Sequence, residues 1–337
     1  MADEFDADDL RTCAETAIAQ WPLDCSRIEF VAARENAVFR IEAVDGRTYA
    51  LRVHRPGYHS LAELESEVEW TVALCEAGID APHMVRTRAG TWYATVPYGN
   101  QGDTRQVGLS EWIDGVPLDQ VTGAVDLVPL YRDLGALMAR MHNQSQSWRP
   151  SKGFVRHSLD ANGLIGDAPW WGQFWDLPEM NREQSSIISE ARHRMFTSLV
   201  ALGTDARTYG LIHADLLPQN VLVRNGRTFV IDFDDAGWGW HHYDMTVAIV
   251  SHADSERFVP VRDSLLEGYR SEREFSSDDE ALLPMFLTIR RLVELGWLHT
   301  RVAHVLQVSE DRTITREELM LPRIERAVVG CREIVPS

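Results

Sequence analysis

Three polar residues in the C-terminal half are placed where they could perform chemistry together. Asp215 and Asn220 stand five residues apart in the stretch LIHADLLPQNVLV, and Asp232 follows twelve residues later in IDFDD. Their surroundings are apolar and strand-like, and an unpaired carboxylate is costly to bury. The fold must therefore supply partners or a metal ion for these acids.

This set of side chains suits phosphoryl transfer from ATP. The reaction needs a carboxylate that orients an attacking hydroxyl, and positioning and electrostatics do most of the catalytic work. It also needs oxygen ligands for Mg²⁺, which takes few protein oxygens and keeps water or phosphate in its other positions. Asn220 and Asp232 suit the metal, and Asp215 suits the role of base or hydroxyl-positioning group. The alternative is that these acids only cap turns, which requires three coincident positions.

The same segments resemble those of a known family. LIHADLLPQN followed by VIDFDDAGWGWHHYD is similar to the catalytic segment of the aminoglycoside phosphotransferase and choline/homoserine kinase family, small-molecule relatives of the protein kinases. Its pattern HxDxxxxN is matched by His213, Asp215 and Asn220, and its metal-binding aspartate by Asp232. The resemblance implies that His213 holds the loop by hydrogen bonds and that Asp244 braces the loop from the next helix.

The resemblance also implies a clamp for the ATP phosphates in the N-terminal part of the chain. The family's lysine is replaced in YALRVHRP by Arg52, which keeps the charge and can bind phosphate bidentately but differs from lysine in reach and shape. Its expected partner on the following helix is Glu67, with Glu65 and Glu69 as alternative alignments. Arg52 could instead be an exposed strand cation, and the glutamates a solvated helix face.

The family's glycine-rich phosphate loop is absent, because the corresponding stretch AARENAVFR contains no glycine. Asn36 and the neighbouring backbone N–H groups are therefore the candidate phosphate cradle. By resemblance and position, the connector LSEWIDG is expected to meet adenine through backbone groups of Glu111, Trp112 and Ile113. DFDD stands in place of the protein-kinase DFG, so no activation switch is expected.

Aromatic residues gather in the helical half, where this family builds its acceptor site. Aromatic faces can bind a cationic amine, although the tryptophans could instead anchor an insertion onto the core. His241 and His242 are not expected to form a metal pair, because adjacent residues of an extended segment point in opposite directions. The candidate acceptor-binding residues are Trp170, Trp171, Trp175, Trp238 and Asp235.

The elements that position these residues follow from the hydrophobic pattern. The turn at Asp45-Gly46 predicts an antiparallel hairpin. Apolar residues at helical spacing predict a helix over 61–77, which Gly78 ends. Strands are expected at 27–33, 37–44, 48–54, 91–96 and 107–113.

After Pro117 the pattern becomes mainly helical. A broad apolar stripe predicts a helix over 127–144, and Asn225-Gly226 predicts a second hairpin after the candidate catalytic loop. Ser277, with Glu280 three residues later, resembles a capping box that opens a long helix.

The resemblance places these elements in an α+β, bilobal, protein-kinase-like fold. It implies a small antiparallel β lobe that binds nucleotide (1–110), a hinge (111–116) and a larger, mainly helical lobe with the catalytic and acceptor sites (117–337).

Composition limits the possible partners. The 337 residues include 33 basic and 51 acidic side chains, a formal net charge of −18. This excess of acidic residues argues against nucleic acid or an anionic membrane as the main binding partner. It agrees with an amine-bearing acceptor, and equally with an acidic surface that serves only solubility. The four cysteines form no CxxC pair, and the sequence shows no signal pattern and no apolar run of the ~18 residues that span a bilayer. We therefore expect a cytoplasmic protein.

The function expected from these features is an ATP- and Mg²⁺-dependent transfer of the γ-phosphate to a hydroxyl of a small, amine-bearing molecule, such as an aminoglycoside, an amino alcohol or a homoserine-like compound. Two alternatives are a protein Ser/Thr kinase of the same fold and a nucleotide-binding pseudokinase. Arg52 and the missing glycines favour the pseudokinase, whereas the intact Asp215, Asn220 and Asp232 argue against it. The tryptophan-rich insertion suggests a covered pocket and argues against a peptide groove.

Overall fold

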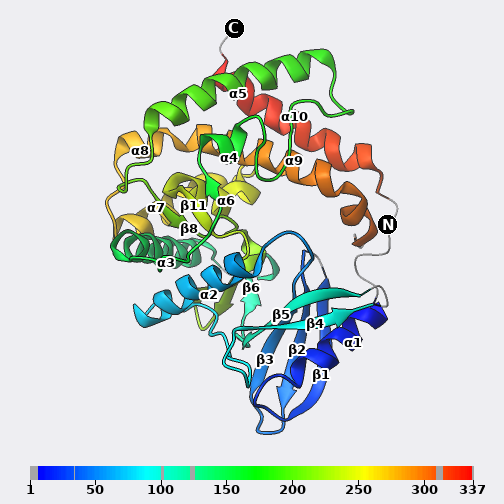
Figure 1. Cartoon of the computed structure of the whole chain (residues 1–337). Helices are drawn as coiled ribbons and strands as arrows, with labels where there is room; N and C mark the ends of the chain where they lie inside the picture. The colour runs from blue at the N-terminus through cyan, green and yellow to red at the C-terminus, as the bar shows by residue number, and fades with distance from the viewer. Residues whose placement is uncertain (1–6, 34, 100–101, 122–125, 309–313, 336–337) are drawn as a thin grey trace. The chain divides into compact units, whose positions relative to one another are not determined.

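The chain folds into two compact units (Figure 1). The N-terminal unit comprises residues 1–115 together with 150–155, and the C-terminal unit comprises residues 116–149 and 156–337. The computed structural model describes residues 7–33, 35–99, 102–121, 126–308 and 314–335.

The N-terminal unit is built on a five-stranded antiparallel sheet in the order β1-β2-β3-β5-β4. In β2 and β3 buried and partly buried residues alternate, as expected for strands with one face on the core. Gly46 makes the predicted turn between them with a φ of 85°. The strands are β1 (Cys25–Ala33), β2 (Ala37–Ala43), β3 (Thr48–Val53), β4 (Tyr93–Tyr98) and β5 (Asp103–Glu111).

Two helices complete this unit. The helix α1 (Ala7–Ile18), which has Asp8 and Asp9 in its first turn, packs against β3, β4 and β5 and is coloured dark blue in Figure 1. The predicted helix is present as α2 (Leu61–Glu76), and Ser60 and Glu63 cap its start reciprocally. Fully buried Trp21 lies in the core beneath the sheet, and its indole N–H donates to the carbonyl of Val85 at 2.7 Å.

The C-terminal unit is mainly helical. Its helices α3 and α7 approach to backbone contact, because a Cβ atom at Gly135 would lie 2.0 Å from the carbonyl oxygen of Leu265. No helix among the described residues is both long enough and apolar enough to cross a membrane. The helices are α3 (Val128–Ser147), α4 (Ala161–Ile165), α5 (Arg182–Leu202), α6 (His241–Ile249), α7 (Phe258–Arg270), α8 (Ser277–Ala281), α9 (Leu283–Val308) and α10 (Arg316–Ile334).

Six short strands in this unit carry the candidate catalytic segments. They form two three-stranded sheets, β10-β9-β6 and β7-β11-β8. The predicted hairpin joins β9 and β10 through Asn225 and Gly226, both with positive φ. Antiparallel pairing of Ile212 with Gly237 brings the end of β8 to the start of β11, so the loops beside them lie together. The strands are β6 (Val116–Pro117), β7 (Ser158–Leu159), β8 (Tyr209–Ile212), β9 (Val221–Arg224), β10 (Arg227–Val230) and β11 (Gly237–Trp240).

One predicted helix start is wrong. The capping box consists of Ser276 and Asp279, not Ser277 and Glu280, and it opens the five-residue helix α8. The long helix α9 begins only at Leu283. Both pairs have the same spacing, but the Asp279 carboxylate also accepts hydrogen bonds from Arg207 at 2.8 and 3.1 Å. Asp279 is buried, and its hydrogen bonds with the more exposed Arg207 favour the earlier register.

Candidate active site

The loop after β8 is held by a carboxylate from α6. Asp244, fully buried, accepts hydrogen bonds from the backbone N–H groups of His213 at 3.0 Å and Ala214 at 2.6 Å. The ring of His142 contributes a third contact, with Nε2 3.1 Å from the same carboxylate. Burial raises the pKa of Asp244 to about 6, an effect that His213 partly offsets. This geometry braces the start of the candidate catalytic loop.

His213 ties the loop to the segment after β10. Its Nε2 lies 3.0 Å from the carbonyl oxygen of Ile231, and its Nδ1 accepts from the backbone N–H of Asp215 at 3.3 Å. Burial lowers the pKa of His213, so the ring is neutral, and these partners imply a proton on Nε2. Both ring nitrogens are thus occupied by backbone groups, an arrangement suited to holding the loop.

Two residues of this region have unusual backbone conformations. Ala214 and Asp232 have φ values of 66° and 67°, in the left-handed region that non-glycine residues seldom adopt. Asn225, in the hairpin turn, is the third such residue among those described. Strain of this kind costs on the order of 1–3 kcal/mol and persists where the surrounding structure enforces it. One of the two strained residues, Ala214, directly precedes the predicted base Asp215, and the other, Asp232, is the predicted metal ligand.

Asp215, Asn220 and the acids of the IDFDD segment come together. The Asn220 amide donates to the Asp215 carboxylate at 2.7 Å and to its backbone carbonyl at 2.9 Å, so its own carbonyl oxygen points elsewhere. Burial, then Asp235 and to a smaller extent Asp232, raise the pKa of Asp215 to about 8, with Arg290 opposing the rise. Three carboxylates and one guanidinium therefore act on one another in this part of the C-terminal unit.

The donor set suits a hard divalent cation. Asn220 offers an amide oxygen and Asp232 a carboxylate, the ligand types that Mg²⁺ prefers. Among the described residues, no group of three or more His, Cys, Asp or Glu side chains is arranged to bind a metal. A two-oxygen site is what Mg²⁺ uses when nucleotide phosphates complete its coordination. A cation here would also offset the excess negative charge of the three carboxylates.

In the N-terminal unit, Arg52 and Glu67 form the expected pair. Arg52 Nη1 lies 3.8 Å from Glu67 Oε1, and both side chains are largely buried. The alternative Glu69 instead accepts hydrogen bonds from the backbone and hydroxyl of Ser151, at 2.7 and 2.8 Å. The side-chain oxygen of Asn36 accepts the backbone N–H of Arg55 at 3.1 Å. Asn36 therefore holds the turn, and its backbone is the part suited to a phosphate.

The connector residues already use part of their hydrogen-bonding capacity. The N–H of Glu111 donates to the carbonyl of His83 at 2.8 Å, and that of Trp112 donates to the carbonyl of Thr48 at 3.0 Å. An adenine contact along Glu111, Trp112 and Ile113 would therefore use their carbonyl groups or the N–H of Ile113.

The tryptophan-rich stretch is packed into the C-terminal unit. Trp171 is 5% exposed and stacks on Tyr243 with ring centres 6.3 Å apart. Trp170 stacks on His157 at 4.2 Å, and the guanidinium of Arg192 lies over the Trp175 ring at 3.9 Å. Another side chain of the protein thus covers one face of each tryptophan ring. This favours tryptophans that anchor the insertion onto the core over tryptophans that form a cage for the acceptor's amine.

Trp238 and Asp235 lie nearer the catalytic segments. Trp238 is partly buried on β11, where it pairs with Leu211 of β8, and Asp235 is partly buried between β10 and β11. Asp235 is the candidate acceptor residue whose charge acts most strongly on Asp215. It is therefore the better placed of the two to meet a cationic group of the acceptor.

Arg156 is a site residue that the sequence analysis missed. It is 8% exposed, and its guanidinium donates to the backbone carbonyls of Phe233, Asp234 and Ala236. These contacts hold the segment that carries Asp232, as Asp244 holds the catalytic loop. Arg156 stands in an irregular stretch, and no local pattern in the sequence marks it.

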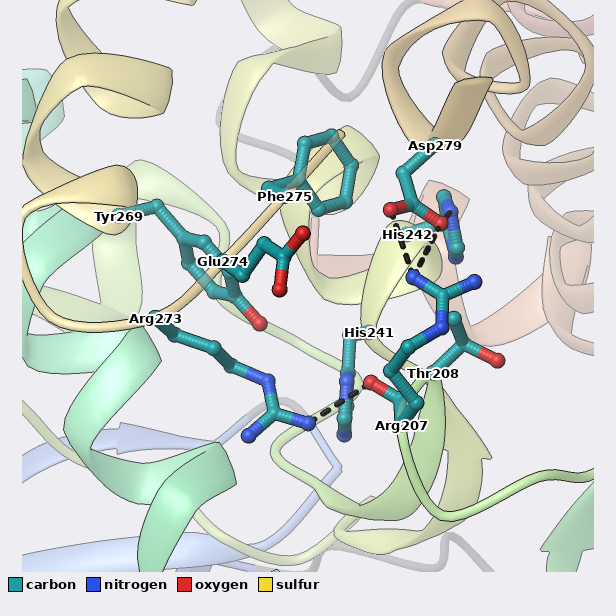
Figure 2. A pocket seen from close by; sticks show the side chains of 9 residues that line it. All are labelled: Arg207, Thr208, His241, His242, Tyr269, Arg273, Glu274, Phe275 and Asp279. Atoms are coloured by element: carbon teal, nitrogen blue, oxygen red, sulfur yellow. Dashed lines mark hydrogen bonds and ion pairs between the residues drawn. The ribbon is translucent and has the colours of Figure 1, made fainter. Parts of the chain in front are cut away.

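The two adjacent histidines line a small pocket at the start of α6 (Figure 2). His241 stacks on His142 at 4.2 Å, and His242 stacks on Phe286 at 5.0 Å. Figure 2 shows both rings beside Arg207, whose guanidinium pairs with Asp279. Burial lowers the pKa of both histidines. Both neutral rings are stacked in the core, and they stand at the start of a helix, not on the extended segment that the sequence analysis assumed.

The chain is similar to phosphotransferases of known fold. A family profile described as "Phosphotransferase enzyme family" matches residues 27–280. A solved structure described as a microcompartment-associated aminopropanol kinase is 31% identical, with 96% of each chain covered and a TM-score of 0.80. An amicoumacin kinase solved with AMP-PNP, Ca²⁺ and Ami is 21% identical, with 99% of this chain and 95% of that one covered and a TM-score of 0.76.

A curated relative extends this comparison to homoserine kinases. The homoserine kinase of Gluconobacter oxydans (strain 621H) is 25% identical over 263 residues, which cover 75% of this chain and 76% of that protein. Together with the solved structures, these likenesses confirm the predicted kinase-like fold, an antiparallel β unit followed by a mainly helical one.

Proposed function

Because the chain belongs to the phosphotransferase enzyme family and is a small-molecule phosphotransferase, we propose that it moves the γ-phosphate of ATP to a hydroxyl of a small, amine-bearing acceptor. The observation that carries this proposal is the contact of Asn220 with Asp215 on a braced loop, beside Asp232 and Asp235. The amicoumacin kinase of the same fold was solved with an ATP analogue and a divalent cation, which agrees with this choice of nucleotide and metal type.

In the proposed reaction, Asp215 orients the acceptor hydroxyl toward the γ-phosphorus. The hydroxyl oxygen forms a bond to phosphorus as the bond from phosphorus to the β,γ-bridging oxygen breaks, and that electron pair leaves with ADP. The hydroxyl proton passes to the Asp215 carboxylate. Asn220 fixes the carboxylate through its amide N–H groups, so the geometry of the base is set before the acceptor arrives.

Mg²⁺ would be held by the Asn220 amide oxygen and the Asp232 carboxylate. When bound, it would neutralise phosphate charge during transfer. Arg156 and Asp244 keep these ligands in place by holding the backbone on either side. Arg52, set by Glu67, would contact the ATP phosphates, and Glu111, Trp112 and Ile113 would meet adenine through backbone groups.

Asp235 is the proposed partner of the acceptor's ammonium group. It lies in the segment that follows Asp232 and acts directly on Asp215, so a cation beside it would place a neighbouring hydroxyl near the base. The similarity to an aminopropanol kinase and to homoserine kinases supports an acceptor of this kind, because both named substrates are small amines with a hydroxyl group.

The test is an acceptor screen with the purified protein. ADP release and ³¹P NMR would be followed with Mg–ATP and panels of amino alcohols, hydroxy amino acids and aminoglycosides, with casein as a protein acceptor. We expect a low background of ATP hydrolysis, and ADP release with a phosphomonoester product when a small amine is supplied. Phosphorylation of casein alone would favour the protein-kinase alternative. Binding of ATP without transfer to any acceptor would favour the pseudokinase.

A further inference from the structure

A partly buried cation of the C-terminal unit makes no hydrogen bond or ion pair with the residues that the structure describes. Arg290, on α9, is partly buried, and its Nε is sealed from solvent without a hydrogen bond. No carboxylate oxygen of the described residues lies within 4.0 Å of its guanidinium nitrogens. A guanidinium does not give up its proton in proteins, so the fold cannot remove this charge. The N–H groups of this guanidinium that no protein group accepts are therefore suited to an anionic ligand.

The surroundings of Arg290 show which ligand it faces. The ionisable groups that act most strongly on it are the Tyr243 phenol, whose raised pKa keeps it neutral, and the carboxylates of Glu294, Asp215 and Asp235. Arg290 acts in return on Asp215 and Tyr243. Asp232, the proposed metal ligand, is not among the strongest influences on it. These electrostatic effects relate Arg290 to the proposed base and the proposed amine partner, which favours an anion of the acceptor over the metal-bound phosphate.

We propose that the acceptor is a hydroxy amino acid in its zwitterionic form, whose carboxylate binds Arg290. Its ammonium group binds Asp235 and its hydroxyl faces Asp215. This inference rests on the proposed function and narrows its substrate class. The three polar groups of such a molecule each meet a protein group of complementary chemistry.

The charges explain why a simple amino alcohol is the poorer acceptor. A planar guanidinium binds a carboxylate through two parallel N–H···O bonds, a strong and directional contact. An acceptor without the carboxylate leaves Arg290 unpaired and brings a second cation into the same volume. Aminopropanol lacks a carboxylate and homoserine carries one, so the relatives' named substrates differ at the group that Arg290 would recognise.

The experiment uses acceptor pairs that differ only by the carboxylate: homoserine with 3-aminopropan-1-ol, threonine with 1-aminopropan-2-ol, and serine with 2-aminoethanol. For the wild-type protein we expect kcat/KM to be about tenfold or more higher for the carboxylate-bearing member of at least one pair. Arg290→Gln should raise the KM of that member about 10–100-fold. It should change the KM of the decarboxylated partner by less than about threefold.

A neighbouring arginine provides the matched control. Arg291, on the same helix, pairs with Asp254 at 2.7 Å and has no role in the proposed site. Arg291→Gln should leave the KM of both members of each pair unchanged. Arg290→Lys keeps the charge without the planar fork, so it should recover part of the preference for the carboxylate.

Three outcomes would overturn the inference: a wild-type preference for the decarboxylated members, an equal loss with both members in Arg290→Gln, or failure of the zwitterions to bind the wild-type protein. Binding is measured separately by calorimetry in the presence of Mg–AMP-PNP, because it does not require turnover. Zwitterion binding that Arg290→Gln abolishes, without phosphate transfer, would support the inference while the proposed function fails.

Discussion

At the scale of single residues, the proposed reaction depends most on one group, the Asp215 carboxylate. Asp215→Ala should lower kcat about 10²–10⁴-fold, because the acceptor hydroxyl loses the group that orients it and takes its proton. AMP-PNP binding, measured by calorimetry, should be retained, since Asp215 is not a proposed metal ligand. Asp215→Asn separates loss of charge from loss of packing and should be nearly as inactive. Normal turnover of either variant would rule out this role for Asp215.

Asp232 and Asp235 stand three residues apart, yet they should respond to different ligands. Asp232→Asn removes a charged metal ligand, so we expect the Mg²⁺ concentration needed for half-maximal AMP-PNP binding to rise about tenfold or more. Asp235→Asn is the matched change and should raise the acceptor KM while the Mg²⁺ requirement stays the same. A magnesium titration of both variants and acceptor kinetics separate the roles. If Asp232→Asn raised only the acceptor KM and Asp235→Asn raised only the Mg²⁺ requirement, the roles assigned to Asp232 and Asp235 would have to be exchanged.

The residues predicted for the C-terminal part of the site share a fixed local spacing, which explains why the sequence reveals them. His213, Asp215 and Asn220 lie on one loop, and the strand pairing of β8 with β11 brings the Asp232 segment beside it. Arg156 and Arg290 have no such spacing. Each reaches the site from a separate element, and a single arginine in a loop or a helix looks the same in sequence whether it meets solvent or a buried backbone.

At the scale of elements, the site depends on α6 holding the loop after β8. Asp244→Asn replaces an acceptor of two backbone N–H groups with an amide that is a weaker acceptor, so the loop should loosen. We expect a drop in kcat of about tenfold or more and a loss of about 1–3 kcal/mol in the free energy of unfolding. Kinetics and urea unfolding measure the two effects.

Asp133→Asn is the control for this prediction. Asp133, on α3, accepts the backbone N–H and the hydroxyl of Thr228 at 2.7 Å each, which holds the β9–β10 hairpin. Its loss should destabilise the protein with little change in kcat. Equal kinetic effects in Asp244→Asn and Asp133→Asn would mean that α6 has no special part in positioning the loop.

The elements themselves were predictable where apolar side chains are large and regularly spaced. The strands β2 and β3 alternate clearly, and α2 carries Leu64, Val68 and Leu74 on its buried face. The buried positions of α1 also follow helical spacing, with Leu10, Cys13, Ala14 and Ala17 on one face behind an acidic first turn. The sequence analysis missed the break between α8 and α9. The spacing of a capping box occurs twice in succession, at Ser276 with Asp279 and at Ser277 with Glu280, and only the burial of Asp279 distinguishes the correct pair.

At the scale of the whole molecule, chain order does not reveal how the N-terminal unit is assembled. Residues 150–155 return to it after the first helix of the C-terminal unit. The backbone N–H of Val155 donates to the hydroxyl of Ser66 at 2.8 Å, across 89 residues of sequence, and Ser151 meets Glu69 across 82. Contacts between residues so far apart in sequence leave no periodic pattern. A segment-by-segment prediction therefore groups residues 150–155 with the C-terminal residues on either side of them.

Stability of the C-terminal unit should depend on pH through its buried histidines. Burial lowers the pKa of His242 from 6.5 to about 4, with Arg207 adding to the effect and Asp279 opposing it. The unfolded chain therefore takes up a proton at this residue near pH 6.5, while the folded chain does so only near pH 4. Stability is lost as pH falls through this window, by about 3 kcal/mol at its lower end. His142 and His241 act in the same direction, and Asp244, with its raised pKa, acts against them.

His242→Phe isolates one member of this group. Phenylalanine keeps the stacking on Phe286 and Phe275 but cannot titrate, so the variant should gain stability relative to wild type as pH is lowered from 6.5 to 4. Urea unfolding followed by circular dichroism at a series of pH values gives this difference directly. His193→Phe, on the exposed face of α5, is the control and should show no such trend. A difference between His242→Phe and wild type that stays constant with pH would mean that the folded protein does not hold this ring neutral.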